Sequence, residues 1–251
     1  MSKSADRFTY LIGIAVLGII LWQVIGFILP DQPSFETGEE FLEELLEESG
    51  GLSQWESIKT FRFDKSFKIY NAGQQLESSR NEEHFYLLSP KICREIHYKN
   101  GPDFITMMYN NDRYTKLVNG AIDSLTTQSS IQQSMQAGVF VINLPFSLSV
   151  KNATLTYLGI ETFQEEKAHK LMVTFKESND IWHLYYNKQS LTWLGYWVKT
   201  SDHYSLIVNE EMEEVKGFML PRKRKSYRTD SAMNIQYLRA TYDYDNYKIE
   251  F

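Results

Sequence analysis

Residues 60 to 70, TFRFDKSFKIY, alternate between apolar and polar side chains and mark the start of extended structure. Phe61 and Phe63, and then Phe67 and Ile69, recur at every second position, which is the period of a strand with one buried face. Similar runs continue to about Tyr242, separated by turn-forming segments such as KNGPD, YNNDRY and NKQS. This spacing predicts an antiparallel meander.

One segment interrupts the meander and predicts an inserted helix. Residues 127 to 146, TQSSIQQSMQAGVFVINLPF, begin with Ser and Thr caps, continue with helical spacing and end in an apolar connection near Pro145. We therefore expect residues 52–251 to form one mainly β domain with inserted helices, an α+β arrangement.

An acidic segment precedes this domain and predicts a short amphipathic helix. Residues 31–51 contain eight acids and no base, and Thr37 with Glu40 fits a capping box. An apolar stripe follows, made by Phe41, Leu42, Leu45 and Leu46. Two interpretations of the helix at 37–48 stay open: it packs its stripe onto the domain, or it binds a protein partner beside a membrane.

An uncharged apolar run lies still closer to the N-terminus. Residues 10–29, YLIGIAVLGIILWQVIGFIL, are long enough to span a bilayer as a helix, and Pro30 ends them. A cleaved signal peptide is the rival interpretation, but its apolar core is shorter and ends in a small-residue site. We expect a retained transmembrane anchor. Because Lys3 and Arg7 precede it, residues 1–9 are predicted to be cytoplasmic and the main domain periplasmic, the topology of a single-pass membrane protein.

The charge pattern excludes nucleic acid as a partner. The net charge is −6, but residues 52–251 carry 24 basic and 23 acidic side chains and no clustered basic face of the required architecture. The sequence also lacks a nucleophile elbow, a zinc helix, a phosphate-binding loop and a dinucleotide fingerprint. We therefore predict no catalytic residue, no metal site and no cofactor, and we expect that the protein is not an enzyme.

The segment Leu191–Thr200 is apolar on both faces of a predicted strand. Leu191, Trp193, Gly195 and Trp197 fall on one face by alternation, and Leu194, Tyr196 and Val198 on the other. Such a strand must be covered on both sides. It is either a central core strand or the indole-lined wall of a groove.

A basic cluster follows at Arg222 to Arg228. Alternation places Arg222 and Arg224 on one face and Lys223 and Lys225 on the other. Two interpretations stay open: an edge strand protected by charge, or a contact of Arg222 and Arg224 with anionic lipid head groups.

Four segments, in this order, resemble the bacterial envelope proteins of the LolA/LolB-like fold. They are GGLSQWESIKTFRF (50–63), INLPFSL (142–148), LYYNKQSLTWL (184–194) and GFMLPRKRKSY (217–227). The resemblance implies an incomplete antiparallel β-barrel wrapped around helices, with an apolar cavity that holds an acyl chain or another apolar ligand. The candidate groove-wall residues, which are equally explicable as core, are Phe140, Ile142, Leu144, Phe146, Trp182, Trp193 and Trp197.

These observations predict a membrane-anchored envelope protein that binds a lipid, an acyl chain or a lipoprotein in a hydrophobic groove. The alternative is a structural or scaffolding subunit of an envelope complex that has no small-molecule ligand and binds its partners through the acidic helix or the anchor.

Overall fold

The computed structural model describes residues 35–149, 153–176 and 178–251. Residues 35–251 form one compact unit. The predicted cytoplasmic segment 1–9 and the predicted anchor 10–29 lie outside the described residues, so both stay predictions. Within the described ranges, every helix is too short or too polar to cross a bilayer.

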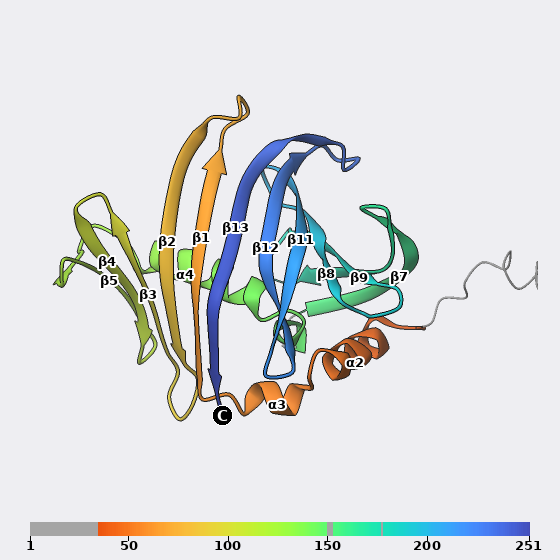
Figure 1. Cartoon of the computed structure of the whole chain (residues 1–251), viewed down its shortest axis with the longest axis horizontal. Helices are drawn as coiled ribbons and strands as arrows, with labels where there is room; N and C mark the ends of the chain where they lie inside the picture. The colour runs from red at the N-terminus through yellow and green to blue at the C-terminus, as the bar shows by residue number, and fades with distance from the viewer. Residues whose placement is uncertain (1–34, 150–152, 177) are drawn as a thin grey trace, which may run out of the picture. The chain divides into compact units, whose positions relative to one another are not determined.

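The described residues contain thirteen strands in one antiparallel sheet (Figure 1). The first six are β1 (Thr60–Tyr70), β2 (Leu76–Leu87), β3 (Cys93–Asn100), β4 (Asp103–Asn110), β5 (Arg113–Val118) and β6 (Ala121–Ile122). The other seven are β7 (Ala153–Phe163), β8 (Glu166–Phe175), β9 (Ile181–Asn187), β10 (Trp193–Lys199), β11 (Tyr204–Val215), β12 (Phe218–Thr229) and β13 (Ile235–Glu250). The helices are α2 (Gly38–Glu48), α3 (Leu52–Glu56), α4 (Gln128–Ile142) and a short 3-10 helix, η1 (Phe146–Ser149).

The sheet is a meander with one long-range connection. Consecutive strands in the chain are neighbours in the sheet, except for β6 and β7, and the first strand, β1, also pairs with the last strand, β13. The order therefore runs from β6 through β1 and β13 to β7, and β6 and β7 are the two edges. The predicted meander and the predicted hairpin across NKQS, which joins β9 to β10, are confirmed.

Helix α2 confirms the predicted helix at 37–48, and its apolar stripe packs against the domain. The Thr37 hydroxyl accepts a hydrogen bond from the Glu40 N–H at 3.0 Å, and the Glu40 carboxylate accepts one from the Glu36 N–H at 2.7 Å. Phe41 and Leu45 are fully buried. Gly38 lies so close to Leu155 that a Cβ would be 2.6 Å from its backbone, so α2 packs tightly on β7. The stripe is therefore part of the core of the domain.

The two faces of the sheet carry different cores. We call the face that packs on the helices the inner face, and Figure 1 shows α4 crossing it. Three apolar clusters cover this face. The α2 cluster includes Phe41, Leu144, Tyr186, Trp193, Tyr196 and Val198; the α3 cluster includes Trp55, Phe61, Phe63, Tyr86, Ile142 and Phe146; the α4 cluster is formed by Ile96, Ile105, Met107, Ile131 and Met135. A smaller outer cluster, formed by Phe163, Ala168, Tyr185, Trp197 and Leu206, lies on the opposite, outer face.

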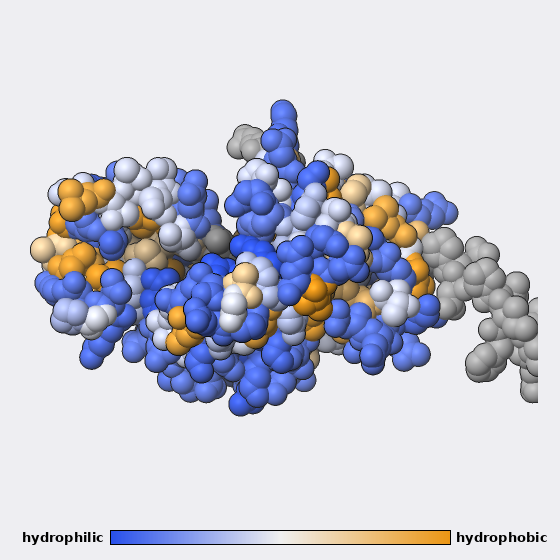
Figure 2. All heavy atoms as spheres, turned by 90° about the horizontal axis from the view of Figure 1, so that it is seen from above, coloured by the Kyte–Doolittle hydropathy of each residue, from blue (hydrophilic) through white to orange (hydrophobic). Residues whose placement is uncertain are grey.

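The surface of the domain is mostly hydrophilic when seen from above, with apolar patches toward its two ends (Figure 2). At the β6 edge, Ile122 and Leu125 are strongly exposed.

Candidate ligand-binding site

A β-bulge in β10 changes which aromatic side chains share a face. Trp193 pairs with Tyr186 and Gly195 with Tyr185, so Leu194 is an extra residue between them. Gly195 has φ +150°, and a Cβ there would be 2.1 Å from the Ile207 carbonyl oxygen. Only glycine fits this close approach without strain. The side-chain alternation therefore reverses at this point.

The reversal corrects the expected faces of β10. Trp193 lies on the inner face with Tyr196 and Val198, whereas Trp197 lies in the outer cluster. The Trp197 indole N–H donates a hydrogen bond to the Thr229 hydroxyl at 3.2 Å. The prediction that Trp193 and Trp197 share one face was wrong, because strict alternation assumes a strand without a bulge.

The other candidate wall residues lie on the inner face in two groups. Ile142 and Phe146 belong to the α3 cluster, where Phe146 stacks on Trp55 with ring centroids 4.4 Å apart. Leu144 and Trp193 are buried in the α2 cluster, and Phe140 and Trp182 pack against it while only half-buried. The structure thus brings together Phe140, Leu144, Trp182 and Trp193.

A continuous aromatic path connects α4 to the sheet within this group. The Phe140 ring is 5.3 Å from Trp182, and Trp182 is 5.0 Å from Tyr196, centroid to centroid. A rim of half-buried apolar side chains borders the α2 cluster, formed by Phe140, Val141, Phe175, Trp182, Leu191 and Met212. This rim is the part of the inner face where an apolar chain would meet aromatic surface first.

The two arginines of the predicted head-group contact occupy different environments. Arg222 is half exposed, and its Nε lies 3.9 Å from the Glu211 carboxylate. Arg224 is 3% exposed and lies on the inner face. Register shifts between Asn209 and Met212 of β11 lie opposite this part of β12, so strict alternation does not fix the face of Arg222. Whether either arginine contacts a head group stays a prediction.

Arg224 is enclosed by aromatic rings. Its guanidinium carbon lies 5.0 Å from the Trp193 ring centroid and 5.5 Å from that of Tyr196. Among the described residues, its Nε and Nη2 have no hydrogen-bond acceptor, and the neighbouring Asn209 Oδ1 and the Tyr186 hydroxyl also have no partner. Buried polar atoms are nearly always satisfied, so such a group needs an explanation.

A second polar group on the inner face is held together by ion pairs around Glu82. Glu82, 5% exposed, accepts from Lys65 at 3.2 Å and from the His84 Nε2–H at 3.1 Å, while Arg80 lies 3.1 Å from its other oxygen. Tyr86 donates its hydroxyl to His84 Nδ1 at 2.8 Å. These bonds assign the tautomer of His84, with the proton on Nε2.

The pKa values of this group follow from burial and charge. Burial alone would raise the pKa of Glu82, but the hydrogen bond from His84 and the charges of Lys65 and Arg80 outweigh it and lower the pKa to about 2. Burial lowers the pKa of His84 and raises that of Tyr86. Glu82 is therefore ionised, His84 neutral and Tyr86 protonated near pH 7. The arrangement suits a structural ion pair better than proton transfer.

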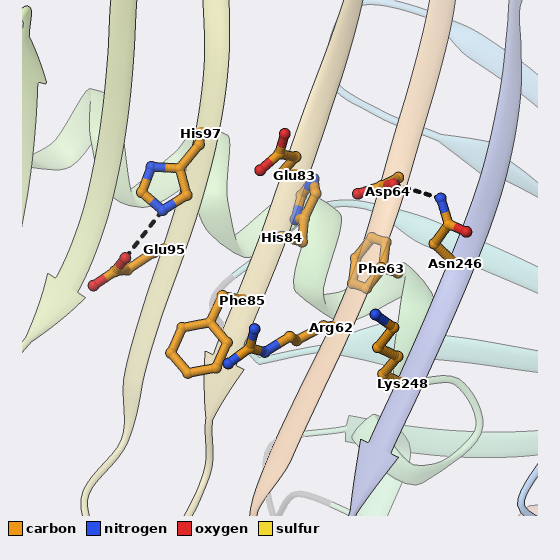
Figure 3. A pocket seen from close by; sticks show the side chains of 10 residues that line it. All are labelled: Arg62, Phe63, Asp64, Glu83, His84, Phe85, Glu95, His97, Asn246 and Lys248. Carbon is orange, nitrogen blue, oxygen red and sulfur yellow. Dashed lines mark hydrogen bonds and ion pairs between the residues drawn. The ribbon is translucent and has the colours of Figure 1, made fainter.

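The outer face carries a separate, polar pocket over β1, β2, β3 and β13 (Figure 3). It has a volume of about 670 Å³ and is lined by Arg62, Phe63, Asp64, Glu83, His84, Phe85, Glu95, His97, Asn246 and Lys248. Several of its polar groups have partners: His97 bonds Glu95 at 3.0 Å and Asn246 bonds Asp64 at 2.7 Å. Arg62 lies over the Phe85 ring at 4.4 Å. Three carboxylates and two permanent cations line the pocket, so its charge is mixed.

Sequence reasoning missed the connected group around Glu82 and the pocket above it. Glu82, His84 and Tyr86 recur at every second position, so alternation alone puts them on one face. What it does not show is that β2 pairs with β1 in the register that sets Lys65 opposite Glu82. Within the described ranges, no three His, Cys, Asp or Glu side chains gather as a metal site would require.

The sequence matches no protein-family model and no curated protein. Similar solved structures include a DUF1329 family protein from Desulfovibrio piger, with 11% identity and TM-score 0.57 over 86% of this chain and 94% of that one. A LolA superfamily protein from Nitrosomonas europaea gives 9% identity and TM-score 0.56 over 86% and 95%. A putative outer membrane lipoprotein-sorting protein domain from Vibrio parahaemolyticus gives 8% and 0.55 over 85% and 92%.

These similarities cover most of both chains and establish the fold. The large antiparallel sheet with a helix across its inner face is a LolA-like fold, as the order of the sequence segments predicted. At these identities the comparison defines the architecture, while the ligand has to be inferred from the residues of this chain.

Proposed function

We propose that the domain binds the acyl chain of a lipid or lipoprotein between α4 and the inner face of the sheet. Two findings support the proposal. The fold is LolA-like, and one of the similar structures is described as a putative lipoprotein-sorting domain. The chain also places Phe140, Leu144, Trp182 and Trp193 together on the inner face.

The observation that carries the proposal is the half-buried aromatic rim. Phe140 of α4 and Trp182 of β9 touch each other across the junction between helix and sheet, yet both keep part of their surface exposed. Burying this surface against an acyl chain is favourable, at about 0.8 kcal/mol for each buried CH₂ group. An outward shift of α4 would extend the rim into a groove.

We further propose that residues 10–29 are a retained anchor and that the domain lies on the periplasmic side. A tethered domain would act as a fixed acceptor or donor of its ligand, not as a shuttle that diffuses between membranes. A reporter enzyme that folds only in the periplasm, fused after Phe251, tests the orientation: activity supports it, and an inactive but stable fusion contradicts it.

Native mass spectrometry of the full chain tests the binding proposal. The protein would be expressed in a bacterial envelope and extracted in a maltoside detergent. We expect adducts with the mass of a defined lipid, and we expect Trp193→Leu to lose them. Trp197→Leu is the matched control, because the two tryptophans lie on the same strand, are 5% and 6% exposed and face opposite sides. Loss in both variants, or a ligand-free wild type that acquires no added lipid, would contradict the proposal.

The second candidate is a scaffolding subunit, and the surface of α2 favours it. The helix exposes six glutamates, Glu39, Glu40, Glu43, Glu44, Glu47 and Glu48, and none forms an ion pair with another described residue. Because the apolar stripe is buried, a protein partner would have to bind this acidic face with a basic surface. In-cell crosslinking from position 43 or 47 would yield a defined heteromeric product if this candidate is correct.

A further inference from the structure

Arg224 differs from Lys65, Arg80 and Lys116, three other cations of the inner face, in having no acidic partner. Lys65 and Arg80 share Glu82, and Lys116 lies 2.8 Å from the Asp123 carboxylate. Among the described residues, no carboxylate lies within ion-pair distance of Arg224, although it is the most deeply buried of the four. An arginine stays charged at all physiological pH values, so this site holds an uncompensated positive charge.

We propose that Arg224 binds the acidic head group, a carboxylate or a phosphate, of an amphiphile whose chain lies along the α2 cluster. This inference rests on the proposed function and specifies its ligand class. An anionic head group supplies the missing countercharge, and the aromatic and aliphatic side chains around Arg224 suit the apolar chain attached to it.

The geometry of the guanidinium supports an oxyanion in particular. The two donors without acceptors, Nε and Nη2, lie on the same edge of the planar group. That edge presents two parallel N–H bonds, the fork that binds two oxygens of a carboxylate or phosphate at once. Trp193 and Tyr196, whose ring centroids are 5.0 Å and 5.5 Å from the guanidinium carbon, help to hold the group in place.

The side chain of Asn209, beside Arg224, further restricts which head groups would fit the site. Asn209 pairs with Arg224 across β11 and β12, and its amide nitrogen donates to the Trp193 carbonyl at 2.9 Å. Its Oδ1 is then an acceptor without a donor. A head group with a hydroxyl beside the acid, such as a singly protonated phosphate monoester, would satisfy both residues.

Binding of three ligands with the same chain and different head groups tests the inference. The full chain in dodecyl maltoside, which has an uncharged head group, would be titrated with hexadecanoate, hexadecyl phosphate and hexadecanol by native mass spectrometry. We expect the two anions to bind about 10- to 100-fold more tightly than the alcohol, the range that one charge-assisted bidentate contact provides. Acetate and inorganic phosphate, which lack a chain, should bind far more weakly.

Three variants test whether the preference for anionic ligands depends on the guanidinium of Arg224. Arg224→Met should bind all three ligands with the affinity of the alcohol. Arg224→Lys keeps the charge but loses the paired N–H edge, so it should retain only part of the preference. Arg222→Met is the matched control, because Arg222 is half exposed and faces Glu211, and it should bind as the wild type does.

The outcomes separate this inference from the function on which it rests. If wild type binds the alcohol as tightly as the anions, the inference is wrong and acyl-chain binding stands. If none of the three ligands binds, the proposed function itself is wrong. Equal affinity for inorganic phosphate and hexadecyl phosphate would show an anion site without a chain site, and would overturn the assignment of an amphiphile.

Discussion

Lys65 and Arg224 both lie on the inner face of the sheet, but the chain neutralises only one of them. Lys65 meets Glu82 at 3.2 Å, and the same carboxylate serves His84 and Arg80. Arg224 meets two aromatic faces and leaves two N–H groups without an acceptor. A buried pair within the chain can be explained by folding alone. A buried charge without a partner lowers stability, and its presence is better explained by a ligand that completes it.

The largest expected loss of stability comes from a backbone change in β10, the strand whose Trp193 and Tyr196 contact Arg224. Gly195→Ala introduces a Cβ that would be 2.1 Å from the Ile207 carbonyl at φ +150°. Strain and overpacking together should lower the free energy of unfolding by about 4 kcal/mol, measured by urea denaturation. Gly159→Ala is the control, because its φ is +86° and nothing lies within 4 Å of the added carbon. Equal losses at the two positions would show that the close approach at the bulge is unimportant.

The second largest loss of stability is expected when the ion pair between Lys65 and Glu82 is removed. The fall of the Glu82 pKa from its ordinary 4.5 to about 2 corresponds to about 3 kcal/mol of stability, and Glu82→Gln should lose about that amount at pH 7. Because the folded-state pKa is lowered, this contribution is complete above pH 4.5 and disappears as the pH falls toward 2. The difference between variant and wild type should therefore shrink over that range.

Glu83→Gln tests whether position or charge matters in this pair. Glu83 follows Glu82 but points to the outer face, where it is exposed. We expect a change within about 0.5 kcal/mol at any pH. A loss as large as that of Glu82→Gln would mean that general charge balance, and not the buried contact with Lys65, stabilises the domain.

The third substitution removes the buried charge of Arg224, and we expect it to raise the stability of the domain. Arg224→Met replaces the guanidinium with an apolar chain, relieving two unsatisfied N–H groups and losing the contacts with Trp193 and Tyr196. In the absence of ligand, the free energy of unfolding should rise by about 1–2 kcal/mol. A fall of similar size would indicate that Arg224 is held for stability. The measurement thus distinguishes a ligand-binding arginine from a structural one.

The comparison also shows how far the sequence predicts this protein. The alternation of Phe61 and Phe63, the capping box at Thr37 and the NKQS turn each depend on residues close in the chain, and each was predicted correctly. The expected pairing of Trp193 with Trp197 on one face was wrong. The error arises where the regular pattern shifts, at the bulge in β10.

The candidate site is harder to predict than the fold for the same reason. A single extra residue exchanges the two faces for the rest of a strand, and alternation cannot reveal where it falls. Only Gly195, between two tryptophans, hints at it in the sequence. The burial of Arg224 likewise depends on aromatic side chains of β10, which lie more than 25 positions earlier in the chain.

The smallest expected effect concerns an arginine that stacks on an aromatic ring at the surface. Arg62 lies 4.4 Å from the Phe85 centroid in the outer pocket, a shorter distance than that between Arg224 and Trp193. Because Arg62 is exposed, water solvates its donors and the contact contributes little. Arg62→Gln should change the unfolding free energy by about 0.5 kcal/mol and leave the preference for anionic amphiphiles intact. If it removed that preference, the outer pocket and not the inner face would be the head-group site, and the distinction between satisfied and unsatisfied cations would no longer identify where the ligand binds.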